Sequence, residues 1–196
     1  MSRLLLAHKV FVASPADVQR ERILAVNTIQ QWNDEHSDAS SAILRPILWE
    51  RAAAPELGSR PQEIVNRRLV RDADVLVAIF WTQVGSSTGK AVSGTVEEIE
   101  EFCDAGKPAL IYFSRRPVRL ENMNTDQWAR LRRVEEKYRS RGIVWSYRTI
   151  SEFQHFLRRH LTDAITRLSD SSQVDVVSSR PPRGARSALS TRTRKA

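Results

Sequence analysis

Two adjacent glutamates, Glu97 and Glu98, lie in a short acidic segment that runs from residue 93 to residue 100. A carboxylate at the mouth of a cleft can stabilise, or bond covalently to, the oxocarbenium-like sugar that forms when an N-glycosidic bond breaks. Glu98 is our candidate for that role. The structural alternative is a capping box, in which Thr95 begins a helix and Glu98 closes onto its first turn. The residue types alone leave both interpretations open.

Polar and aromatic side chains follow the apolar segments that we expect to form strands. In a parallel sheet these strand ends meet at one edge, where ligands bind. We expect Trp81 or Trp49 to stack on a base, although both are also typical core residues. The candidate binding residues are Ser14 and Asp17 after the first strand, Trp49 and Glu50 after the second, Trp81 and Thr82 after the third, Arg115 after the fourth, and Ser93 and Thr95 beside Glu98.

Other common site motifs do not fit the chain. Residues 85–90 (GSSTGK) resemble a phosphate-binding P-loop, but the glycines are one residue too close and Ala91 stands where a hydroxyl must hold magnesium. No G-x-G-x-x-G sequence follows the first expected strand. His155 and His160 are five residues apart in an expected helix, which puts them on different faces, so we predict no metal site.

Strands and helices are expected to alternate along the chain. Apolar runs predict strands at residues 9–13, 43–49, 74–81, 108–113 and 143–145. Helical spacing predicts helices at residues 16–32, 61–69, 96–104, 123–138 and 153–168, with Arg20, Glu21 and Arg22 facing outward. Residues 33–41 are polar and predict a loop, and Pro46 favours an edge strand. The pattern predicts a three-layer, doubly wound α/β fold with five parallel strands in the flavodoxin-like order 2-1-3-4-5.

Composition predicts one folded domain, residues 1–168, and a basic disordered tail, residues 169–196. The 196 residues are 41% hydrophobic, enough for one core. The net charge is +8, and half of it lies from Asp170 onward, so binding of nucleic acid is expected only through this tail. The single cysteine, Cys103, suits a reducing compartment, and no apolar run is long enough to cross a membrane. We therefore expect a cytoplasmic protein without membrane contact.

Several segments resemble a bacterial TIR-like family of unknown function, whose members occur alone or fused to STAND-type NTPases. The resemblance covers roughly residues 8–168. It lies in residues 9–18 (KVFVASPADV) with Glu21 and Arg22, residues 48–50 (LWE), 60–64 (RPQEI), 74–81 (DVLVAIFW), 93–99 (SGTVEEI) and 106–114 (GKPALIYFS). The wider superfamily includes TIR domains and nucleoside 2-deoxyribosyltransferases. Residues 94–99 are similar to the deoxyribosyltransferase motif that carries the nucleophilic glutamate, and Glu98 falls on that position.

The resemblance implies an N-glycosidase that hydrolyses NAD to nicotinamide and ADP-ribose, or acts on a related nucleotide, in bacterial antiphage defence or stress signalling. NAD would be the substrate, with no cofactor, and Asp17 or Glu50 would hold ribose hydroxyls. Self-association or a STAND-type partner is expected, because TIR-like enzymes usually need assembly. The alternatives are a non-catalytic TIR-like interaction module and nucleic-acid binding through the arginine-rich tail.

Overall fold

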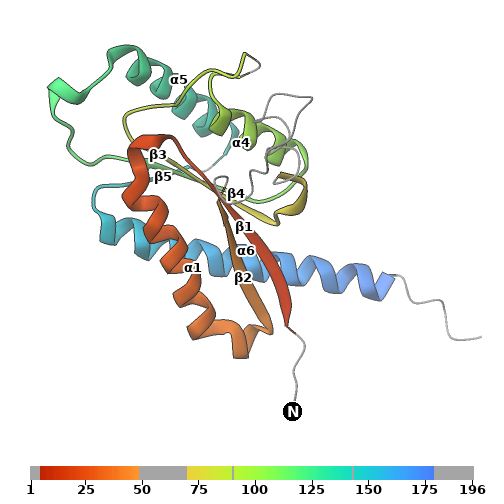
Figure 1. Cartoon of the computed structure of the whole chain (residues 1–196). Helices are drawn as coiled ribbons and strands as arrows, with labels where there is room; N and C mark the ends of the chain where they lie inside the picture. The colour runs from red at the N-terminus through yellow and green to blue at the C-terminus, as the bar shows by residue number, and fades with distance from the viewer. Residues whose placement is uncertain (1–4, 49–69, 90, 143, 179–196) are drawn as a thin grey trace, which may run out of the picture.

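Five parallel strands form one sheet in the order β2-β1-β3-β4-β5, which confirms the predicted flavodoxin-like α/β topology (Figure 1). The structure is a computed structural model and describes residues 5–48, 70–89, 91–142 and 144–178. The strands are β1 (Leu6–Ala13), β2 (Ala42–Leu48), β3 (Val75–Phe80), β4 (Ala109–Ser114) and β5 (Trp145–Tyr147). Every residue of the central strand β3 is buried, as its unbroken apolar sequence predicts. Pro46 lies in β2 at the edge of the sheet, also as predicted.

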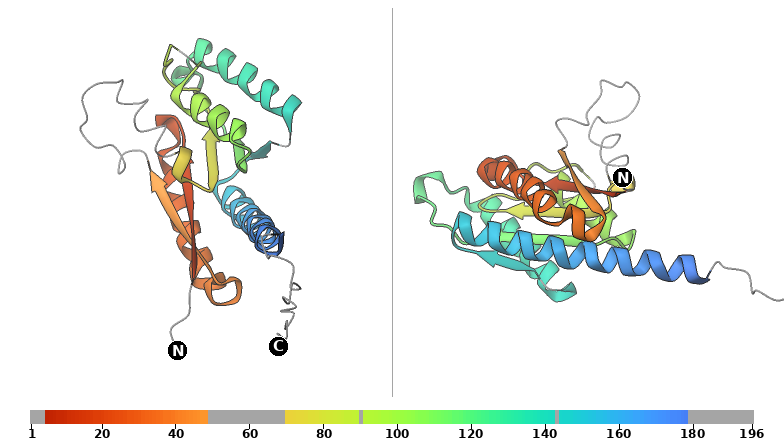
Figure 2. Two further views of the ribbon diagram at one scale, coloured as in Figure 1. Left: turned by 90° about the vertical axis from the view of Figure 1, so that its right-hand side faces the viewer. Right: turned by 90° about the horizontal axis from the view of Figure 1, so that it is seen from below.

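Helices cover both faces of the sheet. The 3-10 turn η1 (Ala16–Val18) leads into α1 (Gln19–Ser40), which packs beside α6 (Ile150–Ser178) on one face. On the other face lie α4 (Gly94–Asp104) and α5 (Thr125–Arg141). The short 3-10 turn η2 (Leu120–Asn122) directly precedes α5. Figure 2 shows α4 and α5 lying together, apart from α6. The two cores follow from strand alternation, because Val10 and Val12 point to the first face and Phe11 and Ala13 to the second.

The helix α1 is longer than predicted, because residues 33–40 continue it instead of forming a loop. Asn33 supplies the reason. Its amide nitrogen donates to the Leu44 carbonyl at 2.8 Å, and its amide oxygen accepts from the Leu44 N–H at 2.7 Å. These bonds hold Asn33 of α1 against the edge strand β2. The polar residues 34–40 therefore continue from a turn whose helical conformation is already fixed. The helix ends at Ser40, and the C-cap residue Ser41 has a left-handed φ of 54°.

One further expectation changes near the C-terminal end of the described chain. The last helix, α6, runs to Ser178 and so extends ten residues beyond the predicted boundary at 168. Residues 179–196 of the predicted tail and the predicted helix at 61–69 lie outside the described residues. Within the described part of the chain, no helix is both long and apolar enough to span a lipid bilayer.

Candidate functional site

A cleft of about 530 Å³ opens between the β1–α1 and β3–α4 connections. The strands β1 and β3 are neighbours, but α1 and α4 leave them toward opposite faces of the sheet. This is the topological switch point, where open α/β sheets bind ligands. Four predicted site residues, Ser14, Ser93, Thr95 and Glu98, are brought together here. The cleft is lined by Ser14, Pro15, Ala16, Gln83, Gly85, Ser86, Ser87, Thr88, Ser93, Gly94, Thr95, Glu98 and Gln127.

Glu98 reaches the cleft from the second turn of α4 and is only 4% exposed. Burial raises the pKa of its carboxyl to about 8, helped by the negative charges of Glu101 and Glu97 and opposed by the positive charge of Arg22. At pH 7 the neutral acid therefore outnumbers the carboxylate by about ten to one in the free protein. Such a perturbed carboxyl in a cleft is typical of a functional group.

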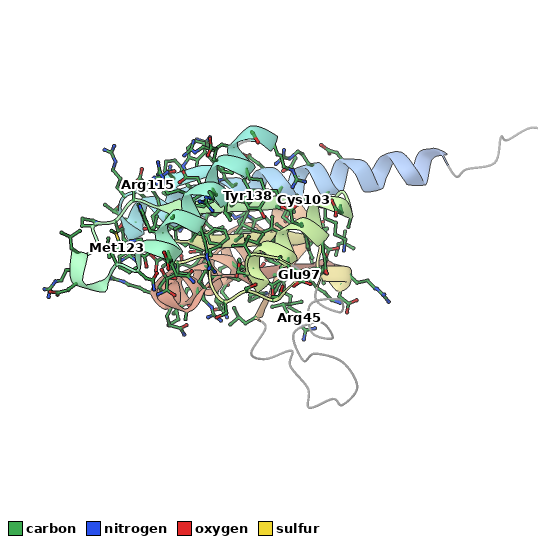
Figure 3. All side chains as sticks on the ribbon, turned by 90° about the horizontal axis from the view of Figure 1, so that it is seen from above. Arg45, Glu97, Cys103, Arg115, Met123 and Tyr138 are labelled. Carbon is green, nitrogen blue, oxygen red and sulfur yellow. The ribbon has the colours of Figure 1, made fainter. Side chains whose placement is uncertain are left out.

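The alternative interpretation, a capping box of Thr95 and Glu98, does not hold, because α4 begins before Thr95. Ser93 is the N-cap, in extended conformation, and its hydroxyl accepts from the Val96 N–H at 3.2 Å. The third helical position is thus Val96, and Glu98 lies too far along α4 to complete a capping box with the N-cap. Glu97, which Figure 3 labels on α4, is half-buried. It is not among the residues that line the cleft. Of the two glutamates, Glu98 is the one at the cleft.

Arg22 of α1 does not line the cleft, but it acts electrostatically on Glu98, which its charge pattern in the sequence did not indicate. It was expected to face outward, but it is 6% exposed. Burial lowers the pKa of its guanidinium, and the charge of Glu98 opposes that shift. Its Nη1 donates to Gln19 Oε1 at 3.4 Å. A buried cation on α1 thus favours the ionised form of the carboxylate on α4.

Asp17 and Thr82 support the cleft indirectly, through hydrogen bonds that fix the backbone at Gln83, which lines it. Asp17 Oδ2 accepts from the Thr82 N–H at 2.8 Å, from the Thr82 hydroxyl at 2.8 Å and from the Gln83 N–H at 3.2 Å. Both residues were predicted to bind ligand, but neither lines the cleft. Ser14 does line it, and its buried Oγ has no hydrogen-bond partner among the described residues. A ligand hydroxyl or phosphate could supply that partner.

Gln127 of α5, which the sequence did not single out, fixes the loop after β3. Its Oε1 accepts from the Val84 and Gly85 N–H groups at 3.1 and 3.2 Å, and its Nε2 donates to the Gly85 carbonyl at 3.3 Å. Gly85 has a φ of 97°, which favours glycine. A Cβ there would lie 3.4 Å from Ser93 Cβ, so the loop packs closely against the start of α4.

Replacing Gln127 by alanine is expected to lower the free energy of unfolding by about 1–3 kcal/mol, because three backbone groups lose their partner. Amide hydrogen exchange at Val84 and Gly85 should accelerate, and urea unfolding measures the stability. Gln127→Glu is the control, since it keeps an acceptor for both N–H groups and should lose less. Slow exchange at both amides in Gln127→Ala would contradict this role.

Trp81 and Arg115 lie at the same edge of the sheet, but they do not line the cleft. The Trp81 ring stacks with Arg116, whose guanidinium carbon is 4.2 Å from the ring centroid, and its Nε1 donates to the Arg116 carbonyl at 3.1 Å. Arg115 forms an ion pair with Glu135 of α5, and Figure 3 shows it well away from Glu97. The predicted stacking of a base on Trp81 is therefore not supported at this cleft. Trp49 and Glu50 lie outside the described residues.

Fold and cleft together define a flavodoxin-like α/β domain with a buried carboxyl at the switch point of its parallel sheet. The chain belongs to the family described as Domain of unknown function (DUF4062), whose model matches residues 9–162. The match confirms the predicted membership in a family of unknown function, over nearly the range that the sequence resemblance covered. No curated protein matches the chain.

Proposed function

We propose that the protein is a TIR-like N-glycosidase that hydrolyses NAD, or a related nucleotide, in bacterial defence or stress signalling. The observation that carries this proposal is Glu98, a carboxyl that is 4% exposed and lines a cleft of about 530 Å³ at the switch point of the sheet. The cleft has the size of a small-molecule site. The resemblance of residues 94–99 to the deoxyribosyltransferase motif supports the role of Glu98.

The proposed chemistry breaks the bond between ribose C1′ and the nicotinamide nitrogen. The bonding electron pair leaves with the base, which becomes neutral, and positive charge develops on C1′ and the ring oxygen. Ionised Glu98 stabilises this charge or forms a bond to C1′. Water then adds its oxygen to C1′ and releases one proton, so the products are nicotinamide, ADP-ribose and a proton. The buried setting strengthens the attraction between carboxylate and sugar.

The raised pKa of Glu98 fits a cationic substrate. A buried neutral acid must lose its proton before it can stabilise an oxocarbenium ion. The nicotinamide ring of NAD carries a positive charge, and a cation near the carboxyl favours the charged form, as Arg22 already does. Binding of NAD is therefore coupled to release of the Glu98 proton, and a neutral substrate offers less of this coupling.

Nicotinamide release tests the proposal. Purified protein is incubated with NAD, with and without a crowding agent that promotes self-association, and the products are separated by chromatography. Hydrolysis yields equal amounts of nicotinamide and ADP-ribose. Concentration-dependent assembly without any product contradicts hydrolysis and favours the non-catalytic interaction module. Assembly of copies of this chain, or with a STAND-type NTPase, is part of the proposal.

The pH dependence of kcat/KM is expected to report the ionisation of Glu98 in the free enzyme. Its pKa of about 8 means that the ionised fraction falls about tenfold for each pH unit below that value. We therefore expect kcat/KM for NAD to rise about tenfold per unit from pH 5.5 to 7.5 and to level off above 8. Initial rates at low NAD concentration measure it. A flat profile between pH 5.5 and 7.5 would contradict a neutral Glu98 in the free enzyme.

A further inference from the structure

A second hollow, of about 720 Å³, adjoins the cleft along the helix α5. Ser87 lines both hollows. Gln127 of α5 lines the cleft, and Arg130, one turn further along the same helix, lines the second hollow. We call this second hollow the groove. Its lining residues are Ser87, Gly89, Ala91, Val92, Val96, Glu100, Arg130, Arg133 and Lys137.

The charges along α5 single out two arginines. The helix carries six basic residues. Four of them pair with buried or half-buried carboxylates, Arg132 and Arg139 with Glu135, and Lys137 and Arg141 with Glu100. Arg130 and Arg133 are exposed and form no ion pair among the described residues, and both line the groove.

The groove is therefore positively charged and open to an anion. Its one carboxylate, Glu100, already contacts Lys137 at 3.2 Å and Arg141 at 2.6 Å, so it does not cancel the charge of the two free arginines. A guanidinium binds phosphate through two parallel hydrogen bonds, and Arg is the preferred residue for this contact. Two neighbouring arginines match two neighbouring phosphates.

The boundary between cleft and groove is a tight turn held by its own hydrogen bonds. Thr88 N–H donates to the Ala91 carbonyl at 3.3 Å, and Ala91 N–H donates to the Thr88 hydroxyl at 3.1 Å. The Ser87 hydroxyl donates to the same Ala91 carbonyl at 3.2 Å. An elongated ligand that enters the cleft at Glu98 can cross this turn and continue into the groove.

We propose that Arg130 and Arg133 bind the 5′-diphosphate of a nucleotide whose ribose lies beside Glu98. The inference rests on the proposed function and narrows its substrate class. Nucleotides that carry a diphosphate, dinucleotides among them, are the substrates, and nucleosides without phosphate are poor ones. Arg130 and Arg133 are thus specificity-determining residues that lie apart from the bond that breaks.

Calorimetric titration with ADP tests the groove independently of turnover. The full-length protein is expected to bind ADP more tightly than adenosine, and the affinity for ADP should fall as salt is raised from 0.05 to 0.2 M. Arg130→Gln/Arg133→Gln is expected to weaken ADP binding by about tenfold for each arginine. Undiminished ADP affinity in this variant overturns the proposal, as does a wild type that binds ADP no better than adenosine.

A matched control removes two arginines from another part of the molecule. Arg159 and Arg167 line a separate hollow of about 360 Å³ beside α6. Arg159→Gln/Arg167→Gln makes the same charge change and should leave ADP binding intact. Loss of ADP binding in this control, with binding retained in the groove variant, places the diphosphate elsewhere and overturns the proposal.

Turnover separates this proposal from the proposed function. The groove variant should raise KM for NAD by at least about tenfold and leave kcat/KM for nicotinamide riboside within about twofold of wild type. An unchanged KM for NAD overturns diphosphate binding by Arg130 and Arg133, but it leaves the proposal of Glu98-dependent hydrolysis intact. If ADP binds through Arg130 and Arg133 but no nicotinamide is released from NAD, the groove is supported and the proposed hydrolysis fails.

Discussion

Replacing Glu98 by glutamine is expected to abolish NAD hydrolysis and to make the protein more stable at neutral pH. Glutamine keeps the shape of the side chain but cannot ionise, so it offers no negative charge to the developing cation. We expect turnover to fall by about a thousandfold or more, as when a group that stabilises transition-state charge is removed. The nicotinamide assay at pH 8 measures the loss.

The gain in stability follows from the same pKa. Glu98 has a pKa of about 8 in the folded protein, against an ordinary value of 4.5. Between these pH values the folded chain holds a proton that the unfolded chain has released, so stability falls as pH rises from 4.5 to 8. At pH 7 this amounts to up to about 3 kcal/mol, since each pH unit is worth 1.36 kcal/mol. Glu98→Gln removes that cost, and the variant should match wild type near pH 4.

Glu97→Gln is the matched control for both effects. Glu97 is the neighbouring glutamate of α4, is half-buried and does not line the cleft. Its replacement should leave turnover within a few-fold of wild type and change stability little. Urea unfolding at pH 4 and pH 7 measures both variants. Equal turnover by wild type and Glu98→Gln removes Glu98 from the chemistry, and equal stability at pH 7 contradicts a buried neutral carboxyl.

The sequence predicts the sheet well because each strand is read from a local pattern. Residues 75–80 are apolar at every position, so only a central strand with helices on both faces can bury them. Pro46 has no backbone N–H to donate to a neighbouring strand, which favours an edge position for β2. The alternation of strands and helices then leaves few topologies. Glu98 becomes a candidate for the same reason, since it lies on the helix that follows the central strand.

The cleft itself is less predictable because strand ends do not reveal which way a side chain turns. Asp17 and Thr82 hydrogen-bond to each other and support the loop, whereas Ser14, three residues before Asp17, faces the cleft. The start of α4 is ambiguous in the same way, because Ser93 and Thr95 are both good N-caps and only Ser93 has the extended backbone.

Helical spacing predicts that Glu21 or Arg22 is buried, whereas the charge of both side chains predicts that they face solvent. The buried positions of α1 and the turn before it include Val18, Ala25, Ile29 and Trp32. Steps of three and four residues that link them require position 21 or 22 to lie on the same stripe. Buried charges are rare unless they are paired, so both were expected to face solvent. The charged partners lie far away in sequence, because Glu21 pairs with Arg116 after β4 and Arg22 interacts with Glu98 of α4.

The partner of Glu21 makes Arg116→Met the most destabilising substitution that we expect outside the cleft. Glu21 is fully buried, and its Oε1 lies 2.6 Å from Arg116 Nη2 and accepts from the Tyr147 hydroxyl at 3.1 Å. Removing the guanidinium leaves a buried carboxylate without its counter-ion, which costs about 3–5 kcal/mol. Urea unfolding at pH 7 measures this loss.

The reverse substitution should cost less, because the two partners differ in their access to water. The Arg116 side chain is 21% exposed and stacks with Trp81, so after Glu21→Gln its charge still reaches solvent and an aromatic face. The double variant Glu21→Gln/Arg116→Met should then be more stable than Arg116→Met alone, because no buried charge is left unpaired. A double variant that is less stable than Arg116→Met would show that the cost comes from lost packing on Trp81, and not from the charge of Glu21.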